Sequence, residues 1–266
     1  MKILILGAGN MVEAFFGRSV ESFTSDEISI TSPSNTSSRD FAKNYGINFI
    51  NFENAFDVEY DAYILGMKPQ VLLEQAKFFG EKIPKGKLII SILAGVDVNK
   101  LQGIFSTSQV IRLMPNTPSA VSMGVCPVYA TSSTDELFLD YFAKSLQNTG
   151  LIFFVDNEDK LDKITPYSGS GPAYFFEIAR IYTEKLISEG IPADLAREAI
   201  AMTMKGSAEL ILQSNKSLDT LRDNVTSKKG VTYEALAEMK ENKLELILNS
   251  AIDRAHRRVT ELKKGS

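Results

Sequence analysis

Two glycine-rich segments, far apart in the chain, contain residue types that can bind small charged ligands through the backbone. The first, Gly7-Ala8-Gly9-Asn10-Met11, directly follows an apolar run and opens a helical pattern. The second, Ser168-Gly169-Ser170-Gly171-Pro172, leads into an apolar pattern of helix length. Glycines allow close backbone approach, and a helix start attracts anions, although the second segment also suits a neighbouring backbone. We expect a nucleotide site in one half of the chain and a substrate site in the other.

The first segment has the context of a dinucleotide-binding turn, because it lies between a strand pattern and a helix pattern. Gly7 would allow the tight turn, and Gly9 would let a pyrophosphate approach the N–H groups of residues 9–11. Val12 replaces the third glycine of the pattern, and Ala14 could still allow close packing of the helix on the sheet. The alternative is a plain strand-to-helix turn.

The end of the second strand pattern distinguishes NAD from NADP, because a carboxylate there binds the ribose 2′-hydroxyl. Residues 31–35 read Thr-Ser-Pro-Ser-Asn and contain no carboxylate. The hydroxyl groups and the nearby Arg39 suit a 2′-phosphate. The segment therefore predicts NADPH as the cofactor, with NADH as the alternative, unless these residues form only a polar turn.

Two later strand ends also have residues suited to a cofactor. Met67-Lys68-Pro69 follows one apolar run, and Ala94-Gly95 follows another. In doubly wound sheets, ligands bind at the carboxyl ends of the strands. We therefore expect both segments to face the nucleotide.

Side chains for other common chemistries are scarce. The one histidine, His256, lies among arginines in a late helical pattern and is expected at the surface, and Cys126 lies in an apolar strand pattern. A Ser-His-Asp or Cys-His mechanism has little support, and no His/Cys cluster has the spacing of metal ligands. We therefore predict no metal site.

Composition narrows the class of protein further. The chain has 266 residues, a net charge of −4 and a pI near 5.3, which argues against a nucleic-acid partner. One cysteine cannot form an intramolecular disulfide, which favours a reducing compartment. No apolar run approaches the roughly 20 residues of a membrane span. These features predict a soluble, cytoplasmic protein without a membrane partner.

The elements that must hold these residues follow two different patterns. Up to about residue 155, short β-type runs alternate with helical stretches, which predicts an α/β domain with a mostly parallel sheet and helices on both faces. The predicted strands are 2–6, 27–31, 62–67, 87–93, 110–114, 125–130 and 151–155. The predicted helices between them are 11–22, 38–45, 69–79, 97–103 and 134–148.

After about residue 160 the pattern is helical, with predicted helices at 172–189, 193–213, 232–240 and 242–263. The chain is thus divided into domains 1–157 and 158–266. The second domain carries a wide apolar face, including Ile200, Leu210 and Leu212. Helices of this kind often pack on a copy of themselves, so we expect a homodimer. Burial against the first domain is the alternative.

These residues together resemble the pyrroline-5-carboxylate reductase family. Four segments carry the resemblance in the family's order and spacing, and a weaker fifth match covers 91–96. The four are 7–11, Lys68-Pro69-Gln70, Arg112-Leu113-Met114-Pro115-Asn116-Thr117-Pro118 and 168–175. The resemblance implies an N-terminal Rossmann domain, a C-terminal helical dimerisation domain and a nicotinamide cofactor, usually NADPH. Dimers associate further in some members of the family.

The resemblance also implies a set of site residues. The implied cofactor contacts are Gly7, Ala8, Gly9, Asn10, Met11, Ser32, Asn54, Met67, Lys68, Pro69 and Ala94. Asn51 competes with Asn54, because the loop before it does not align to the residue. The implied substrate loop reads Val225-Thr226-Ser227-Lys228-Lys229-Gly230-Val231-Thr232, where the family has Val-Thr-Ser-Pro-Gly-Gly-Thr-Thr. Ser227, Gly230, Val231 and Thr232 are thereby assigned to the substrate.

The implied reaction is the NADPH-dependent reduction of 1-pyrroline-5-carboxylate to L-proline, the last step of proline synthesis. In the family the loop holds the substrate carboxylate, and its last threonine, here Thr232, lies near the ring nitrogen. Lys228 and Lys229 replace a proline and a glycine, and lysine is strained where φ is positive. This departure leaves two alternatives, a reductase of another imine or small keto acid and a catalytically weak, NADPH-binding regulatory protein.

Overall fold

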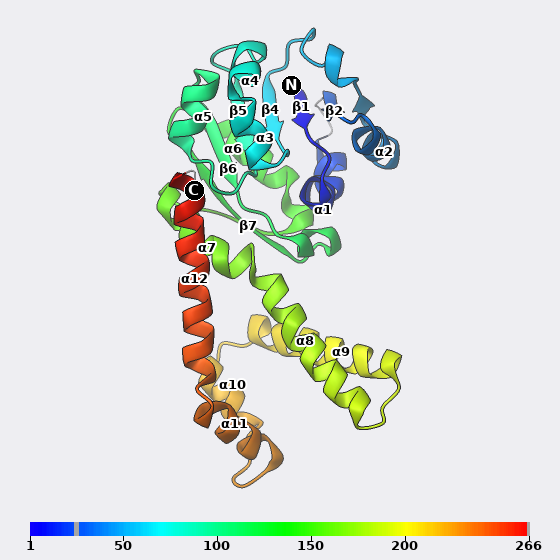
Figure 1. The fold of residues 1–266 in the computed structure, drawn as a ribbon, viewed down its shortest axis with the longest axis vertical. Helices are drawn as coiled ribbons and strands as arrows, with labels where there is room; N and C mark the ends of the chain where they lie inside the picture. Colours follow the sequence, from blue (N-terminus) through cyan, green and yellow to red (C-terminus); the bar gives the residue numbers. More distant parts are fainter. Residues whose placement is uncertain (24–26, 265–266) are drawn as a thin grey trace. The chain divides into compact units, whose positions relative to one another are not determined.

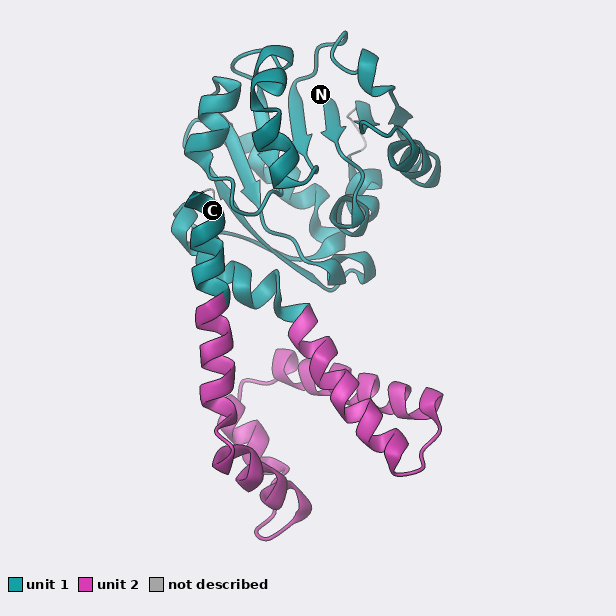
Figure 2. Ribbon diagram, in the orientation of Figure 1, with its two compact units in different colours: residues 1–172, 255–266 teal, residues 173–254 magenta. Residues whose placement is uncertain are grey.

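The computed structural model describes residues 1–23 and 27–264. The chain forms two compact units (Figure 2). The first unit comprises Met1–Pro172 and Ala255–Ser266, and the second comprises Ala173–Arg254. These units assign 158–172 and the end of the chain to the first unit. The predicted domain division between residues 157 and 158 stays a prediction.

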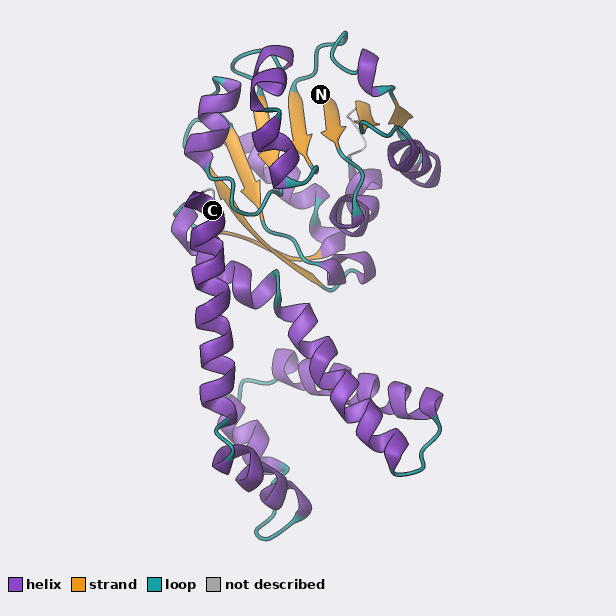
Figure 3. Cartoon of the chain, in the orientation of Figure 1, coloured by secondary structure: helices purple, strands orange, loops and turns teal. Residues whose placement is uncertain are grey.

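The first unit contains a sheet of eight strands in the order β3-β2-β1-β4-β5-β6-β7-β8 (Figure 3). All neighbouring pairs are parallel except β6 and β7, which are antiparallel. The strands are β1 Lys2–Leu6, β2 Glu27–Thr31, β3 Asn48–Phe49, β4 Ala62–Leu65, β5 Leu88–Ser91, β6 Val110–Leu113, β7 Gly124–Ala130 and β8 Gly150–Phe154. The predicted α/β class and its mostly parallel sheet are confirmed. Only β3 was not predicted, because two residues leave no readable pattern.

The central strands are mostly apolar because helices cover both faces of the sheet. Ile3 and Ile5 belong to one buried cluster, whereas Leu4 and Leu6 belong to another. Side chains of α1, α2 and α6 fill the first cluster, and side chains of α3, α4 and α5 fill the second. Side chains alternate along each strand, so each strand contributes to two separate cores, one on each face of the sheet.

Helices α1 to α6 lie between strands along the chain, and α7 follows the last strand (Figure 1). They are α1 Asn10–Ser19, α2 Thr36–Tyr45, α3 Pro69–Glu74, α4 Ala76–Lys82, α5 Val98–Phe105, α6 Glu136–Ser145 and α7 Glu158–Ser168. The single helix predicted over 69–79 is wrong, since Gln75 leaves helical geometry at φ −111° and ψ 21°. The sequence analysis missed α7, which is rich in charged residues and contains Pro166.

The remaining helices carry the chain through the second unit. They are α8 Gly171–Ser188, α9 Ala193–Gln213, α10 Leu218–Asn224, α11 Val231–Glu241 and α12 Leu244–Lys264, whose last turns belong to the first unit. The predicted bounds of α9 are confirmed at both ends. The short α10 was not predicted, although Ser217 caps it by accepting a hydrogen bond from the Thr220 N–H at 3.2 Å.

The second unit has almost no interior of its own. Ala196 is the only buried residue in the fully described range 173–254. Large apolar side chains are exposed along its helices, among them Leu210 at 63%, Ile211 at 50% and Leu212 at 80%. Water-exposed apolar surface of this extent marks an interaction face. In the described residues, no helix combines the length and apolarity needed to traverse a lipid bilayer.

Candidate functional site

The turn after β1 has a geometry that requires glycine at position 7. Gly7 adopts φ +108°, and its N–H donates to the Thr31 carbonyl at 2.8 Å. A Cβ placed on Gly7 would lie 2.7 Å from the Gly66 carbonyl carbon and from the Met67 nitrogen. Backbone atoms cannot yield at such distances, so the turn brings β1 and β4 together only with glycine there.

The start of α1 is left open at Gly9. Gly9 is the extended N-cap residue, and no side chain caps the first turn. A Cβ on Gly9 would meet no heavy atom within 4 Å. The first N–H groups of a helix lack partners within the helix, and together with the helix dipole they favour an anion. These residues fit the pyrophosphate of a dinucleotide, as expected from the glycine pattern.

The missing third glycine of the pattern is compensated on the opposite strand. Val12 is fully buried, and a Cβ on Gly66 would collide with its Cγ2 atom. The close approach of helix and sheet is therefore provided by Gly66 at the end of β4. The role expected for Ala14 stays a prediction: α1 buries Val12, Phe15 and Phe16, and Ala14 is half-buried.

The turn from β2 to α2 is lined with hydroxyl groups. Ser32 is buried, and its Oγ donates to Ser38 Oγ at 2.9 Å. Asn35 precedes α2 with φ 58°, and no side chain caps that helix. The guanidinium of Arg39 lies 5.0 Å from the centre of the Phe49 ring. This turn thus combines an open helix start with hydroxyls and a cation, and no carboxylate lies in residues 31–35.

A second loop borders the β2–α2 turn. The N–H of Phe52 donates to Asn35 Oδ1 at 3.0 Å, which ties residues 51–54 to that turn. Asn51 and Asn54 are both exposed at opposite ends of this short loop. The geometry leaves both as candidates for the cofactor.

The other predicted cofactor residues follow β4 and β5, the two strands next to β1 on one side. Met67 is half-buried, and Lys68 is exposed directly before Pro69, the first residue of α3. Ala94 is exposed in the turn after β5. Because β1, β4 and β5 are parallel, their carboxyl ends meet at one edge of the sheet. The structure therefore gathers the turns after Leu6, Leu65 and Ser91 at a single edge.

The family segments around Asn116 and Ser168 are joined directly. The Asn116 side chain, 5% exposed, donates from Nδ2 to the Ser168 carbonyl at 2.8 Å. Its Oδ1 accepts a hydrogen bond from the Val125 N–H at 2.8 Å. The resemblance rests on both segments, but the sequence pattern predicts no role for Asn116. Its place between Pro115 and Pro118 is the sequence feature that could have marked it as a structural residue.

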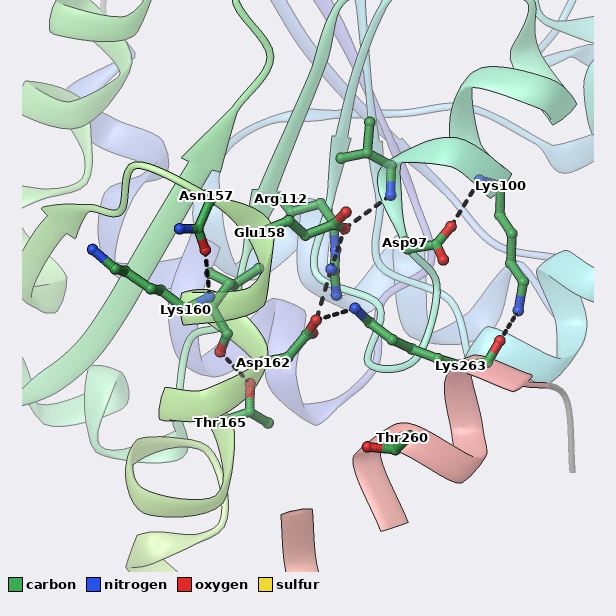
Figure 4. Close-up of polar contacts among 12 residues, drawn as sticks. Asp97, Lys100, Arg112, Asn157, Glu158, Lys160, Asp162, Thr165, Thr260 and Lys263 are labelled. Carbon is green, nitrogen blue, oxygen red and sulfur yellow. Dashed lines mark hydrogen bonds and ion pairs between the residues drawn. The ribbon is translucent and has the colours of Figure 1, made fainter. Parts of the chain in front are cut away.

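Arg112 in β6 is the second residue to which the sequence analysis gave no role. Its side chain is fully buried, and Nη1 pairs with Glu158 and, at 3.5 Å, with Asp162 on α7 (Figure 4). Asp162 also pairs with Lys263 near the end of α12. An arginine in the middle of an apolar strand requires buried carboxylate partners, but which carboxylates these are follows only from the fold.

The predicted substrate loop precedes α11 in the second unit. Gly230 is the extended N-cap residue of α11, and no side chain caps this helix. The Gly230 N–H donates to the Ser227 carbonyl at 3.0 Å, and a Cβ on Gly230 would collide with Ser227 Oγ. Val231 is 91% exposed, whereas Thr232 is half-buried. The loop can therefore offer a carboxylate the N–H groups of a helix start.

Lys229 in this loop has the strained conformation that its glycine counterpart would adopt freely. Its φ is +57°, in the left-handed region. Lysine is strained only where φ is positive, and the structure places Lys229 there.

The single cysteine is not a nucleophile. Cys126 is buried in β7, and burial raises the pKa of its thiol well above the usual range. The neutral thiol belongs to the buried core, as the apolar strand pattern around it suggests.

Comparison with known proteins agrees with this architecture. Residues 158–262 match the family described as pyrroline-5-carboxylate reductase dimerisation, and residues 2–95 match that described as NADP oxidoreductase coenzyme F420-dependent. A pyrroline-5-carboxylate reductase of Vibrio alginolyticus is 30% identical over 266 residues, covering 99% of this chain and 98% of the relative.

Solved structures extend the likeness to the whole fold. A reductase of this kind from Coxiella burnetii has a TM-score of 0.84 at 26% identity, covering 98% of this chain and 97% of the other. One from Streptococcus pyogenes has a TM-score of 0.86 at 24% identity, covering 99% and 98%. The relationship extends over both units at the level of sequence and of structure. The chain therefore belongs to the pyrroline-5-carboxylate reductase family.

Proposed function

We propose that this protein reduces 1-pyrroline-5-carboxylate to L-proline with a nicotinamide cofactor, NADPH in preference to NADH. The observation that carries the proposal is the relationship to named reductases over 99% of the chain. It is supported by the open helix starts at α1 and α11, one suited to a pyrophosphate and one to a carboxylate.

Residues at the carboxyl edge of the sheet hold the cofactor in this proposal. They are Gly7, Ala8, Gly9, Asn10, Met11, Ser32, Asn54, Met67, Lys68, Pro69 and Ala94. The bound nicotinamide supplies the hydride. The preference for NADPH is supported by the lack of a carboxylate in residues 31–35 and by the hydroxyls and guanidinium near the start of α2.

The loop before α11 orients the substrate. N–H groups at the start of α11 and the Ser227 hydroxyl bind the carboxylate, with Gly230 and Val231 supplying the backbone. Thr232 Oγ1 donates a hydrogen bond to the ring nitrogen. A threonine hydroxyl is too weak an acid to protonate the imine, so either a water provides the proton, or the substrate binds already protonated and its N–H donates to Thr232 Oγ1. Positioning of the imine contributes to the acceleration, because positioning alone can be worth up to about 7–11 kcal/mol.

The functional protein is a homodimer formed by the helices of the second unit. The match of 158–262 to a dimerisation family supports this assembly. The exposed apolar side chains of α8 and α9 support it physically, because a second copy would remove them from water. The single, buried cysteine suits a reducing, cytoplasmic location.

A second substrate is favoured by one specific observation. Lys228 and Lys229 add two cations to the substrate loop, and Lys229 is held at φ +57°. Extra positive charge beside the carboxylate site favours substrates with more negative charge. A related anionic imine or keto acid is therefore the alternative substrate.

Steady-state kinetics with the purified protein tests these assignments. NADPH oxidation is followed with 1-pyrroline-5-carboxylate, with other cyclic imines and with small keto acids, and is repeated with NADH. Proline formation from 1-pyrroline-5-carboxylate with the highest kcat/KM supports the proposal. A higher kcat/KM with another acceptor would transfer the assignment to that substrate. Binding of NADPH without turnover of any acceptor would indicate a regulatory protein.

A further inference from the structure

The turn after β5 belongs to the proposed cofactor edge, and a segment from the other end of the chain packs against it. The turn contains Ala94 and Gly95 and leads to Asp97, the N-cap residue of α5. Asp97 Oδ1 accepts a hydrogen bond from the Lys100 N–H at 2.8 Å. The distant segment is the last turn of α12, residues Leu262 and Lys263, which lies within the same compact unit.

Leu262 touches the turn at its tightest position. Gly95 adopts φ +77°, and a Cβ there would lie 2.8 Å from Leu262 Cβ and 3.3 Å from the Leu262 carbonyl carbon. The α12 backbone therefore lies against the turn at a distance that only glycine allows. A shift of α12 would either press on Gly95 or leave it without support.

Lys263 binds the same region through charged and polar groups (Figure 4). Its Nζ pairs with Asp162, and its carbonyl accepts a hydrogen bond from Lys100 Nζ. Lys100 lies on α5, the helix that begins directly after the turn. The end of α12 is thus bound both to α7 and to α5.

Glu158 joins the start of α5 to the buried arginine. Its Oε1 accepts from the Val98 N–H at 2.9 Å and also pairs with Arg112 Nη1. Asp162, one turn later on α7, lies 3.5 Å from the same nitrogen. Since Arg112 is fully buried and the Glu158 side chain is 19% exposed, solvent screens this network less than it screens surface ion pairs. The network therefore holds both ends of the segment from Gly95 to Lys100.

We propose that Leu262 and Lys263 are positioning residues for the cofactor: they hold the Ala94–Gly95 turn in the conformation that binds NADPH. This inference rests on the proposed function, because it takes Ala94 as a cofactor contact. Neither residue needs to touch the nucleotide. Leu262 acts through its contact with Gly95, and the Lys263 side chain acts through Asp162, which shares Arg112 with the Glu158 carboxylate that holds the start of α5.

The test uses the full-length protein with two substitutions at the end of α12. Leu262→Ala removes the apolar contact to Gly95. Lys263→Met keeps the packing of the side chain but removes the pair with Asp162, and the Arg112 pairs remain. Arg112 itself is avoided, because removing a partner from a buried ion pair is strongly destabilising. Lys264→Met is the matched control, since Lys264 is the exposed neighbour.

The dissociation constant for NADPH is measured by fluorescence titration, together with kcat, both KM values and the melting temperature. Leu262→Ala and Lys263→Met are expected to raise the NADPH dissociation constant by roughly twofold to thirtyfold, the range seen for residues that act on a ligand without contact. The KM for the imine should change less than twofold, and Lys263→Arg should restore most of the affinity. Lys264→Met should match the wild type.

Two results would overturn the inference. One is a lowered melting temperature in both variants with an unchanged NADPH dissociation constant, which would make the contact purely structural. The other is an equal loss of affinity in Lys264→Met. Failure of the proposed function is recognised separately, because the wild-type protein would then fail to bind NADPH or to reduce the imine.

Discussion

Replacing Lys229 by glycine should relieve strain that the structure places in the substrate loop. Lys229 has φ +57°. For an L-residue the left-handed conformation costs roughly 1–2 kcal/mol, and for glycine almost nothing. Glycine also increases the entropy of the unfolded chain, which lowers stability by about 0.4–1 kcal/mol. These two effects oppose each other, so Lys229→Gly alone is a weak test.

The neighbouring lysine supplies the control that isolates the strain. Lys228 is also exposed, but it is not among the described residues with positive φ. Lys228→Gly and Lys229→Gly remove the same charge and add the same unfolded-state entropy. Their difference in stability is therefore the strain itself, about 1–2 kcal/mol in favour of Lys229→Gly.

Thermal unfolding followed by circular dichroism at one fixed protomer concentration measures this difference. The concentration must be fixed because dimerisation stabilises the folded state. A difference of 1–2 kcal/mol corresponds to a melting temperature roughly 2–8 °C higher for Lys229→Gly than for Lys228→Gly in a chain of this size. If Lys228→Gly melts at the same or a higher temperature, the left-handed conformation of Lys229 does not store the strain inferred here.

Four further outcomes are expected. Thr232→Ala should lower kcat about tenfold to a hundredfold, because one hydrogen bond to a developing charge is worth roughly 1.5–3 kcal/mol. The NADPH dissociation constant should stay unchanged. Unchanged kcat and KM would contradict the role of the loop. Gly9→Val should abolish NADPH binding by filling the open space at the start of α1, whereas Gly103→Val, which also faces open space, should retain it. Ser32→Asp should shift the ratio of kcat/KM values from NADPH toward NADH, because the new carboxylate repels the 2′-phosphate. Ser34→Asp, at an exposed residue, should shift the ratio less. An unchanged ratio in Ser32→Asp would argue against Ser32 as a determinant of cofactor preference. Light scattering should show a dimer at micromolar concentration, and Leu212→Asp, at a side chain that is 80% exposed, should weaken it; a monomeric wild type would refute the assembly.

Local sequence determined the regular elements of the first unit. The bounds of β1 follow from an apolar run that ends at a glycine, and those of β2 from an alternation of polar and apolar residues that ends in a polar turn. The glycine spacing at Gly7 and Gly9 likewise predicts the open start of α1, because the backbone conformation there depends on residues within one turn. Elements without a local signal were missed, notably the two-residue β3 and the charged α7.

Contacts between distant segments were decided only by the tertiary structure. The hydrogen bond from Asn116 to Ser168 joins segments that lie 52 positions apart. The missing third glycine is replaced by Gly66, which no local pattern connects to Val12. The burial of Arg112 between two carboxylates, and the contact of Leu262 with Gly95, depend on how strands and helices pack in three dimensions. Residue types and spacing therefore predicted which segments carry the chemistry, whereas long-range packing decided which side chains hold those segments in place.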